Sequence, residues 1–274
     1  STMLMSALTG VLVSAYTQNL PLAVFCGILM GIVMGIFMGY FHILMNTNLI
    51  LTGVAINTFT RGATVMILYT FTGDKGSSSL VKSLAVGNWD IPVIKDIPIL
   101  GQILSGHNGF TYFAFLAVIF TWFLMYRTPL GLRIRAVGEN SSAAESVGEN
   151  PAKSKLIALG FSGFFSALGG MYMSMGNMSV FITNMTGGRG FIGVAADAMG
   201  RGNPIGAMLA SLLFGAANAV ANVLQINNFP VDMVMAIPYV VSIAGIIIYS
   251  ANEQHRKNSR VKQAIRAAER EETA

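Results

Sequence analysis

The stretch 126–155, YRTPLGLRIRAVGENSSAAESVGENPAKSK, is the longest polar interruption between the apolar segments that fill most of the chain. Its five basic residues are Arg127, Arg133, Arg135, Lys153 and Lys155. Ser142 and Glu145 have the spacing of a capping box, and Gly148 is typical of a helix end. We therefore predict a helix of about two turns over 141–148. Because so short a helix does not persist alone in water, it either belongs to a solvated loop or docks against a partner.

The composition on both sides of this stretch predicts a membrane protein. The chain has 274 residues, of which 53% are hydrophobic and 11% charged, with a mean hydropathy of +0.61. Soluble domains carry about 25% charged residues, and several apolar runs here reach the ~20 residues that cross a bilayer as a helix. The predicted fold is all-α and polytopic, with about seven to nine transmembrane helices.

The apolar segments give the expected order of spans along the chain. The predicted spans cover about 3–17, 20–44, 48–71, 109–126, 154–175, 205–224 and 231–250. A further piece, 191–200, is too short to cross alone, and glycine-rich sequence on both sides predicts a broken segment near 187–204. The chain opens inside an apolar run at Met3, so we expect residues upstream of it to be missing.

Four glycines in the second segment lie at helical spacing. Gly27, Gly31, Gly35 and Gly39 repeat every four residues, so on a helix they form one smooth ridge. Such a ridge lets a neighbouring helix approach closely inside a membrane. It predicts close helix packing and carries no information about a substrate.

The distribution of positive charge gives an orientation. Eleven of the 17 lysines and arginines lie in 127–155 or after residue 253, as the positive-inside rule places them. We therefore expect a transmembrane domain over 1–250 with a cytoplasmic loop at 127–153 and an external loop at 72–108. Residues 251–274 are expected to form a basic cytoplasmic tail, and the net charge of +5 does not indicate a nucleic-acid partner.

Five polar residues inside apolar segments are candidates for a substrate pathway: Asn57, Arg61, Asp197, Asn218 and Asn222. Ionisable residues at membrane depth usually face a protein or water-filled interior. The alternatives are hydrogen bonds between helices for the amides, and snorkelling to water for the charges. Similar expected depths also suggest that Arg61 and Asp197 form a buried ion pair.

Catalytic and metal-binding motifs are absent from the sequence. It contains no P-loop, no H-E-x-x-H and no G-x-S-x-G. Cys26 is the single cysteine, and the three histidines, His42, His107 and His255, are scattered. We predict no catalytic residue, no metal site and no cofactor bound by this chain. A membrane protein of this kind is a channel, a secondary carrier or a subunit driven by a partner.

Several motifs together resemble the permease subunits of bacterial ABC importers for simple sugars, branched-chain amino acids and nucleosides. The general motifs are Arg135-Ala-Val-Gly-Glu-Asn140, Ala143-Ala144, Gly148, Ser162-Gly163 and Leu168-Gly-Gly170. Those most similar to the nucleoside branch are Gly53-Val-Ala-Ile-Asn57 with Gly62 and Thr64, Gly188-Arg-Gly-Phe-Ile192, Ala195-Ala196 and Gly202-Asn-Pro-Ile-Gly206. The resemblance extends over about residues 3–250.

The resemblance implies a function and a set of partners. Two permease subunits form a pathway through a bacterial cell membrane, a cytoplasmic ATP-binding subunit uses ATP, and an extracytoplasmic solute-binding protein or lipoprotein delivers the solute. In the family the loop at 127–155 docks a short coupling helix into the ATP-binding subunit. The residues implied in that coupling are Gly138, Glu139, Asn140, Ala143, Ala144 and Gly148.

Alternatives remain at this stage. The first is a simple-sugar or branched-chain amino-acid permease of the same fold. The second is a stand-alone carrier or channel, which needs ionisable residues along a path, and only Arg61 and Asp197 are candidates. The third, a structural membrane protein, leaves the short helix unexplained. The family pattern has apolar residues where Arg61 and Asp197 stand, which leaves the substrate open.

Overall fold

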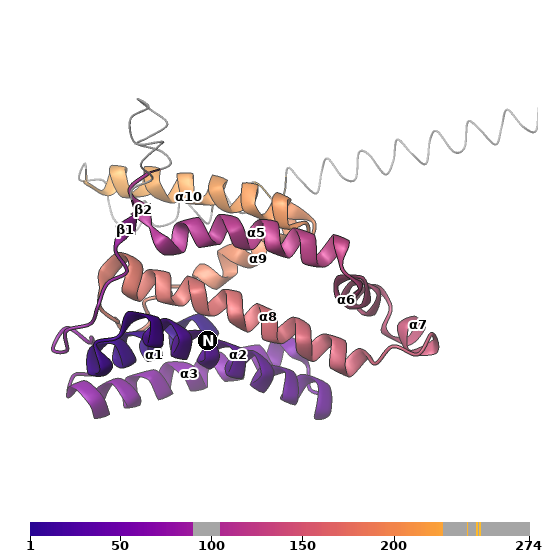
Figure 1. The fold of residues 1–274 in the computed structure, drawn as a ribbon, viewed down its shortest axis with the longest axis horizontal. Helices are drawn as coiled ribbons and strands as arrows, with labels where there is room; N and C mark the ends of the chain where they lie inside the picture. Colours follow the sequence, from indigo (N-terminus) through magenta and orange to yellow (C-terminus); the bar gives the residue numbers. More distant parts are fainter. Residues whose placement is uncertain (90–104, 227–239, 241–244, 246, 248–274) are drawn as a thin grey trace, which may run out of the picture. The chain divides into compact units, whose positions relative to one another are not determined.

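The computed structural model describes residues 1–89, 105–226, 240, 245 and 247 (Figure 1). The elements are α1 (Thr2–Thr17), α2 (Leu20–Gly39), α3 (Leu49–Thr72), β1 (Asn88–Trp89), β2 (His107–Asn108), α5 (Gly109–Arg127), α6 (Pro129–Glu139), α7 (Ser141–Ser146), α8 (Pro151–Met171), α9 (Arg189–Gly200) and α10 (Pro204–Ile226). The predicted all-α fold is confirmed: five helices in the described part are long and apolar enough to cross a membrane. The tail 251–274, and all but three residues of the span expected at 231–250, lie outside the described residues.

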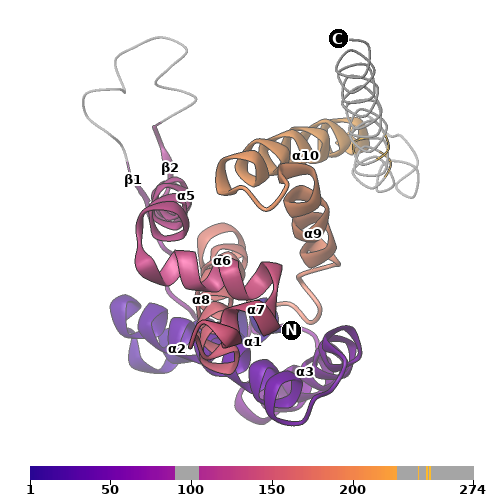
Figure 2. The same ribbon diagram turned by 90° about the vertical axis from the view of Figure 1, so that its right-hand side faces the viewer.

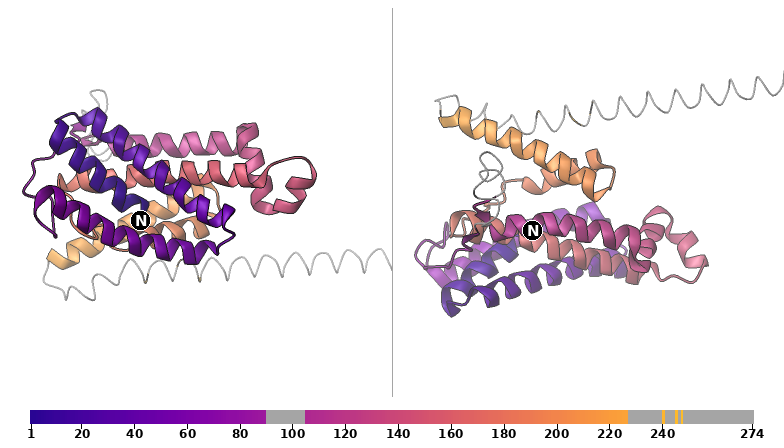
Figure 3. Two further views of the ribbon diagram at one scale, coloured as in Figure 1. Left: turned by 90° about the horizontal axis from the view of Figure 1, so that it is seen from below. Right: turned by 45° about the horizontal axis from the view of Figure 1, so that its top comes forward.

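The chain divides into two compact units, Ser1–Gly187 and Gly188–Ala274. In the first unit, α1, α2 and α8 pack side by side (Figures 1 and 3). Their shared core contains the fully buried Leu4, Leu8, Val11 and Met171. Two helices continue as π-helical segments, Tyr40–Leu44 after α2 and Tyr172–Met178 after α8.

The glycine ridge of α2 packs closely against another helix, as the spacing predicted, and the structure identifies that helix as α8. All four glycines are buried. A Cβ atom added to Gly31 would lie 2.6 Å from the carbonyl oxygen of Gly163 and 2.5 Å from the Cβ of Ala167. The two backbones therefore approach at a distance that only glycine permits, which maximises van der Waals contact in a bilayer.

The segment that follows α3 is held by hydrogen bonds to the segment that follows α8. The N–H of Ser78 donates to the oxygen of Phe181 (2.8 Å), and the N–H of Phe181 donates to Ser78 Oγ (2.8 Å). Farther along, the N–H of Val86 donates to the oxygen of Met175 (2.9 Å). The described part of the expected external loop is thus paired backbone packed on the bundle, while residues 90–104 lie outside the described residues.

One helix was not predicted. The sequence suggested a polar loop with a single short helix over 127–155, but α6 occupies eleven of these residues. Its start combines a capping threonine with a proline in the first turn: the N–H of Gly131 donates to Thr128 Oγ1 (3.2 Å), and Pro129 follows the cap. This pair is a standard start signal, so the helix was detectable from the sequence.

The second unit contains α9 and α10, joined by a tight turn (Figure 2). Gly200 and Gly206 touch: a Cβ on Gly206 would lie 2.7 Å from the oxygen of Gly200. Arg201 and Gly202 both have positive φ, and Asn203 Oδ1 accepts the N–H of Ile205 (3.0 Å). The predicted broken segment is confirmed, because the 12 residues of α9 span only about 18 Å.

Candidate functional site in the α6–α7–α8 connection

The connection begins where α5 meets α6, at one end of the first unit's bundle (Figure 1). The turn is tight: a Cβ on the buried Gly131 would collide with the carbonyl oxygen of Leu124. The guanidinium of Arg127 lies 5.9 Å from the ring centre of Trp122, and that of Arg135 lies 4.6 Å from the ring centre of Tyr126. Aromatic rings and cations gather in this way at the headgroup level of a membrane.

The short helix α7 is present where the sequence predicted it, but its N-cap was wrong. The structure places the cap at Asn140, whose Oδ1 accepts the N–H of Ala143 (3.1 Å). The predicted cap, Ser142, already lies inside the helix. The reason is that α6 continues to Glu139, which leaves Asn140 as the single extended residue between two helices, and asparagine caps as well as serine does.

Gly148 ends α7 in a Schellman motif, as predicted in outline. Its φ is +89°. The N–H of Gly148 donates to the oxygen of Glu145 (2.9 Å), and the N–H of Glu149 donates to the oxygen of Ala144 (3.1 Å). These are the two bonds that define the motif, so this polar end of the bundle has a defined backbone conformation.

Replacing Gly148 with alanine is expected to destabilise this end of α7. A residue with a side chain at a left-handed φ costs about 1–2 kcal/mol. Hydrogen–deuterium exchange should show faster exchange of the N–H groups of 148 and 149. Gly138→Ala is the matched control, because a Cβ there meets no atom within 4 Å and Gly138 lies inside helix α6. Equal exchange of these N–H groups in the two variants would contradict the role of Gly148 in ending α7.

The two alanines proposed for coupling differ in burial. Ala144 is 5% exposed and packs against its own chain. Ala143 is exposed, and so are Gly138 and Glu139. Asn140 and Gly148, which cap the two ends of α7, are exposed as well. Of the six residues only Ala144 is buried, so the other five are available to a partner. The coupling role itself stays a prediction.

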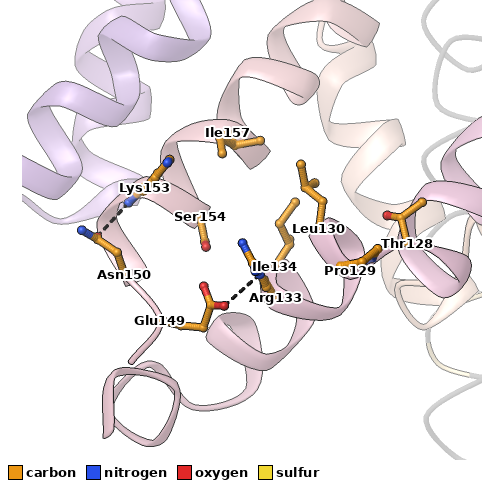
Figure 4. A pocket seen from close by; sticks show the side chains of 10 residues that line it. All are labelled: Thr128, Pro129, Leu130, Arg133, Ile134, Glu149, Asn150, Lys153, Ser154 and Ile157. Atoms are coloured by element: carbon orange, nitrogen blue, oxygen red, sulfur yellow. Dashed lines mark hydrogen bonds and ion pairs between the residues drawn. The ribbon is translucent and has the colours of Figure 1, made fainter. Parts of the chain in front are cut away.

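A cavity of about 340 Å³ lies between α6 and the first turns of α8 (Figure 4). Arg133 Nε pairs with Glu149 Oε1 at 2.8 Å across it. Asn150 Oδ1 caps α8 by accepting the N–H of Lys153 (3.1 Å). The residues that line it are Thr128, Pro129, Leu130, Arg133, Ile134, Glu149, Asn150, Lys153, Ser154 and Ile157. Charged groups and aliphatic walls together make this an amphipathic pocket.

The candidate pathway residues fall into two groups. Asn57 is half-buried and Arg61 exposed on one face of α3, four residues apart. Asn218 and Asn222 lie four apart on α10, half-buried and exposed, and Asp197 is exposed on α9. Because the groups belong to different units, both the pathway and the Arg61–Asp197 pair stay predictions.

Sequence reasoning missed the residues that build the cavity. Arg133 and Glu149 are sixteen positions apart and meet only because α6 and α7 fold the chain back. The start of α8 was placed at 154, although Asn150 followed by Pro151 carries the same cap-and-proline signal as α6. Among the described residues, no group of three or more His, Cys, Asp or Glu side chains is placed to hold a metal.

These features define a multi-pass helical membrane protein with a capped, polar helical connection at one end of its bundle. The chain belongs to the family described as branched-chain amino acid transport system / permease component, whose profile matches residues 1–248. No solved structure matches the chain significantly.

Three curated relatives show the closeness of the similarity. The chain is 33% identical over 200 residues to the guanosine ABC transporter permease protein NupQ of Bacillus subtilis, covering 71% of this chain and 62% of the relative. It is 30% identical to the nucleoside ABC transporter permease protein NupC of Lactococcus lactis, covering 73% and 64%. It is also 30% identical to the putative glucose ABC transporter permease protein TsgC13 of Haloferax volcanii, covering 80% and 65%. The chain thus spans less than two thirds of the length of these relatives.

Proposed function

We propose that this chain is the transmembrane permease subunit of an ATP-driven importer for nucleosides or related sugar-containing solutes. The two relatives reported first are a guanosine and a nucleoside permease protein. The single structural observation that supports a partner-driven transporter is α7, a six-residue helix capped at both ends whose Ala143 is exposed. A helix this short gains stability by docking.

The proposed partners follow from the family and from the relatives. The chain is also similar to a second permease protein in each of two organisms, NupP of Bacillus subtilis and NupB of Lactococcus lactis. We therefore infer a second permease subunit beside this one. ATP hydrolysis is assigned to a cytoplasmic ATP-binding subunit, and delivery of the solute to an extracytoplasmic binding protein or lipoprotein. This chain itself is proposed to carry no catalytic site, metal or cofactor.

The proposed topology puts α7 in the cytoplasm of a bacterial cell. Residues 1–250 form the permease domain, with 127–153 inside, 72–108 outside and the tail 251–274 inside. The basic residues near α7 support this orientation by the positive-inside rule. In this arrangement Gly138, Glu139 and Ala143 contact the ATP-binding subunit, and the five polar residues in the spans line the solute path.

The substrate class is tested in proteoliposomes that contain this permease and its partner subunits. Guanosine and adenosine are expected to stimulate ATP hydrolysis and to accumulate inside when ATP and the binding protein are supplied. Glucose and ribose are the comparison, because permease proteins for these sugars are also similar to the chain. Stimulation by a sugar or leucine alone would select another branch of the family, and uptake without ATP would select a carrier or channel.

A further inference from the structure

Three cavities follow one another along α8, the first beside α6 and the other two beside α5. The amphipathic pocket of about 340 Å³ shares Ile134 with an apolar cavity of about 220 Å³, which Phe120, Leu124, Ala158 and other residues line. That cavity in turn shares Phe165 with a third, of about 390 Å³, near Phe113 and Leu168. We call these three neighbouring cavities together the groove. The last two lie along α5, a helix none of whose residues is buried.

The mouth of this groove is basic, and the rest is apolar. Arg133 and Lys153 both line the pocket at the mouth. Glu149 occupies only one donor of Arg133, through Nε, and a guanidinium has five donors. Lys153 is exposed, and among the residues that the structure describes it has no ion-pair partner. The cations beside Trp122 and Tyr126 place this mouth at the headgroup level.

A hydroxyl that reaches the pocket has no hydrogen-bond partner among the described residues. Ser154 is 8% exposed and lines the cavity, where Figure 4 shows its oxygen on the side facing Arg133 and Glu149. Within the described part of the chain its Oγ makes no hydrogen bond, and the oxygen is accessible from the cavity and not sealed in the core. A ligand oxygen in the pocket would supply that partner.

We propose that the mouth binds the phosphate of an anionic phospholipid, with an acyl chain in the groove between α5 and α8. The phosphate oxygens are bound by Lys153, by the free donors of Arg133 and by the Ser154 hydroxyl. The part of the acyl chain next to the headgroup contacts Leu130, Ile134 and Ile157. Basic pockets between membrane helices bind anionic headgroups in this way. The proposal does not depend on the transported solute.

Charge and shape favour this occupant over the alternatives. A free phosphate would use the cations and leave the apolar part of the groove unfilled. A transmembrane helix of a partner would fill the groove and leave the cations at the mouth without an anion. A phospholipid matches both parts, because its anionic head would lie at the basic mouth and its apolar tail in the apolar groove.

The test measures lipid retention by native mass spectrometry of the complex purified in mild detergent. We expect retained phosphatidylglycerol to exceed phosphatidylcholine, and Lys153→Gln to lower that preference about fivefold, which corresponds to one basic contact at a membrane surface. Lys155→Gln is the matched control, because Lys155 lies two residues on in α8 and lines a different hollow. An equal loss of the lipid preference in both variants would show a general electrostatic attraction to anionic lipids and would overturn the proposed site.

Two further experiments test whether an acyl chain lies in the groove and whether free phosphate can replace the lipid. Ala158→Phe fills the middle cavity and is expected to reduce retention of both lipids while the unfolding temperature is kept. Unchanged retention would show that no acyl chain lies in the groove. Inorganic phosphate at 10 mM is expected to leave the lipid bound, because phosphate has no acyl chain to bury in the groove. Displacement by phosphate alone, or equal retention of the two lipids, would overturn the proposal.

Discussion

Replacing Gly163 with leucine is expected to prevent most of the protein from folding. A Cβ at position 163 would collide with the carbonyl oxygen of Gly31 and lie 3.0 Å from its carbonyl carbon. These are backbone atoms of α2, so no rotamer change relieves the contact, and the two helices must separate. Overpacking by an alanine at this position costs about 1–3 kcal/mol, and leucine adds three more carbon atoms.

The measurement is the monodisperse fraction and the thermal unfolding midpoint in detergent, for the alanine and leucine variants of Gly163. Gly160 gives a matched control on the same helix, since a Cβ there meets no atom within 4 Å. Gly160→Ala should be neutral or stabilising by up to about 1 kcal/mol, because alanine is the better helix former. If Gly163→Ala unfolds at the same temperature as Gly160→Ala, the close contact between α2 and α8 is wrong.

Replacing Ala143 with tryptophan is expected to abolish solute-stimulated ATP hydrolysis and transport without unfolding the permease. Ala143 is exposed on α7, so a large side chain there would clash with a docked partner and not with this chain itself. Ala144→Trp should behave differently. Ala144 is only 5% exposed, so the bulky ring must displace side chains of this chain that pack around it.

The two variants therefore separate a contact with a partner from a role in folding. ATPase activity, transport and the unfolding midpoint are measured together in the assembled complex. Ala136→Trp, exposed on the neighbouring helix α6, serves as control and should keep both activities. Normal stimulation in Ala143→Trp would contradict docking of α7, whereas an unfolded Ala143→Trp would contradict its exposure.

The sequence by itself determined the class of the fold and most of its local structure. The length of an apolar run decides whether a helix crosses a membrane, and that is a property of the chain alone. The expected span 20–44 coincides with α2 and its π-helical extension, and 109–126 differs from α5 by one residue. The glycine ridge and the end of α7 at Gly148 were also predictable, because each depends on residues within a few turns.

Tertiary structure decided what the local pattern left open. The ridge specified close packing, but its partner, α8, lies more than a hundred residues away, and no spacing encodes that choice. Asn140 caps α7 in place of Ser142 because α6 continues up to it. Likewise, Ala143 and Ala144 are the same residue type, and only tertiary packing leaves Ala143 exposed and buries Ala144. The pocket between Arg133 and Ser154 exists because two helices fold the polar connection back on itself, so it depends on contacts that are distant in sequence.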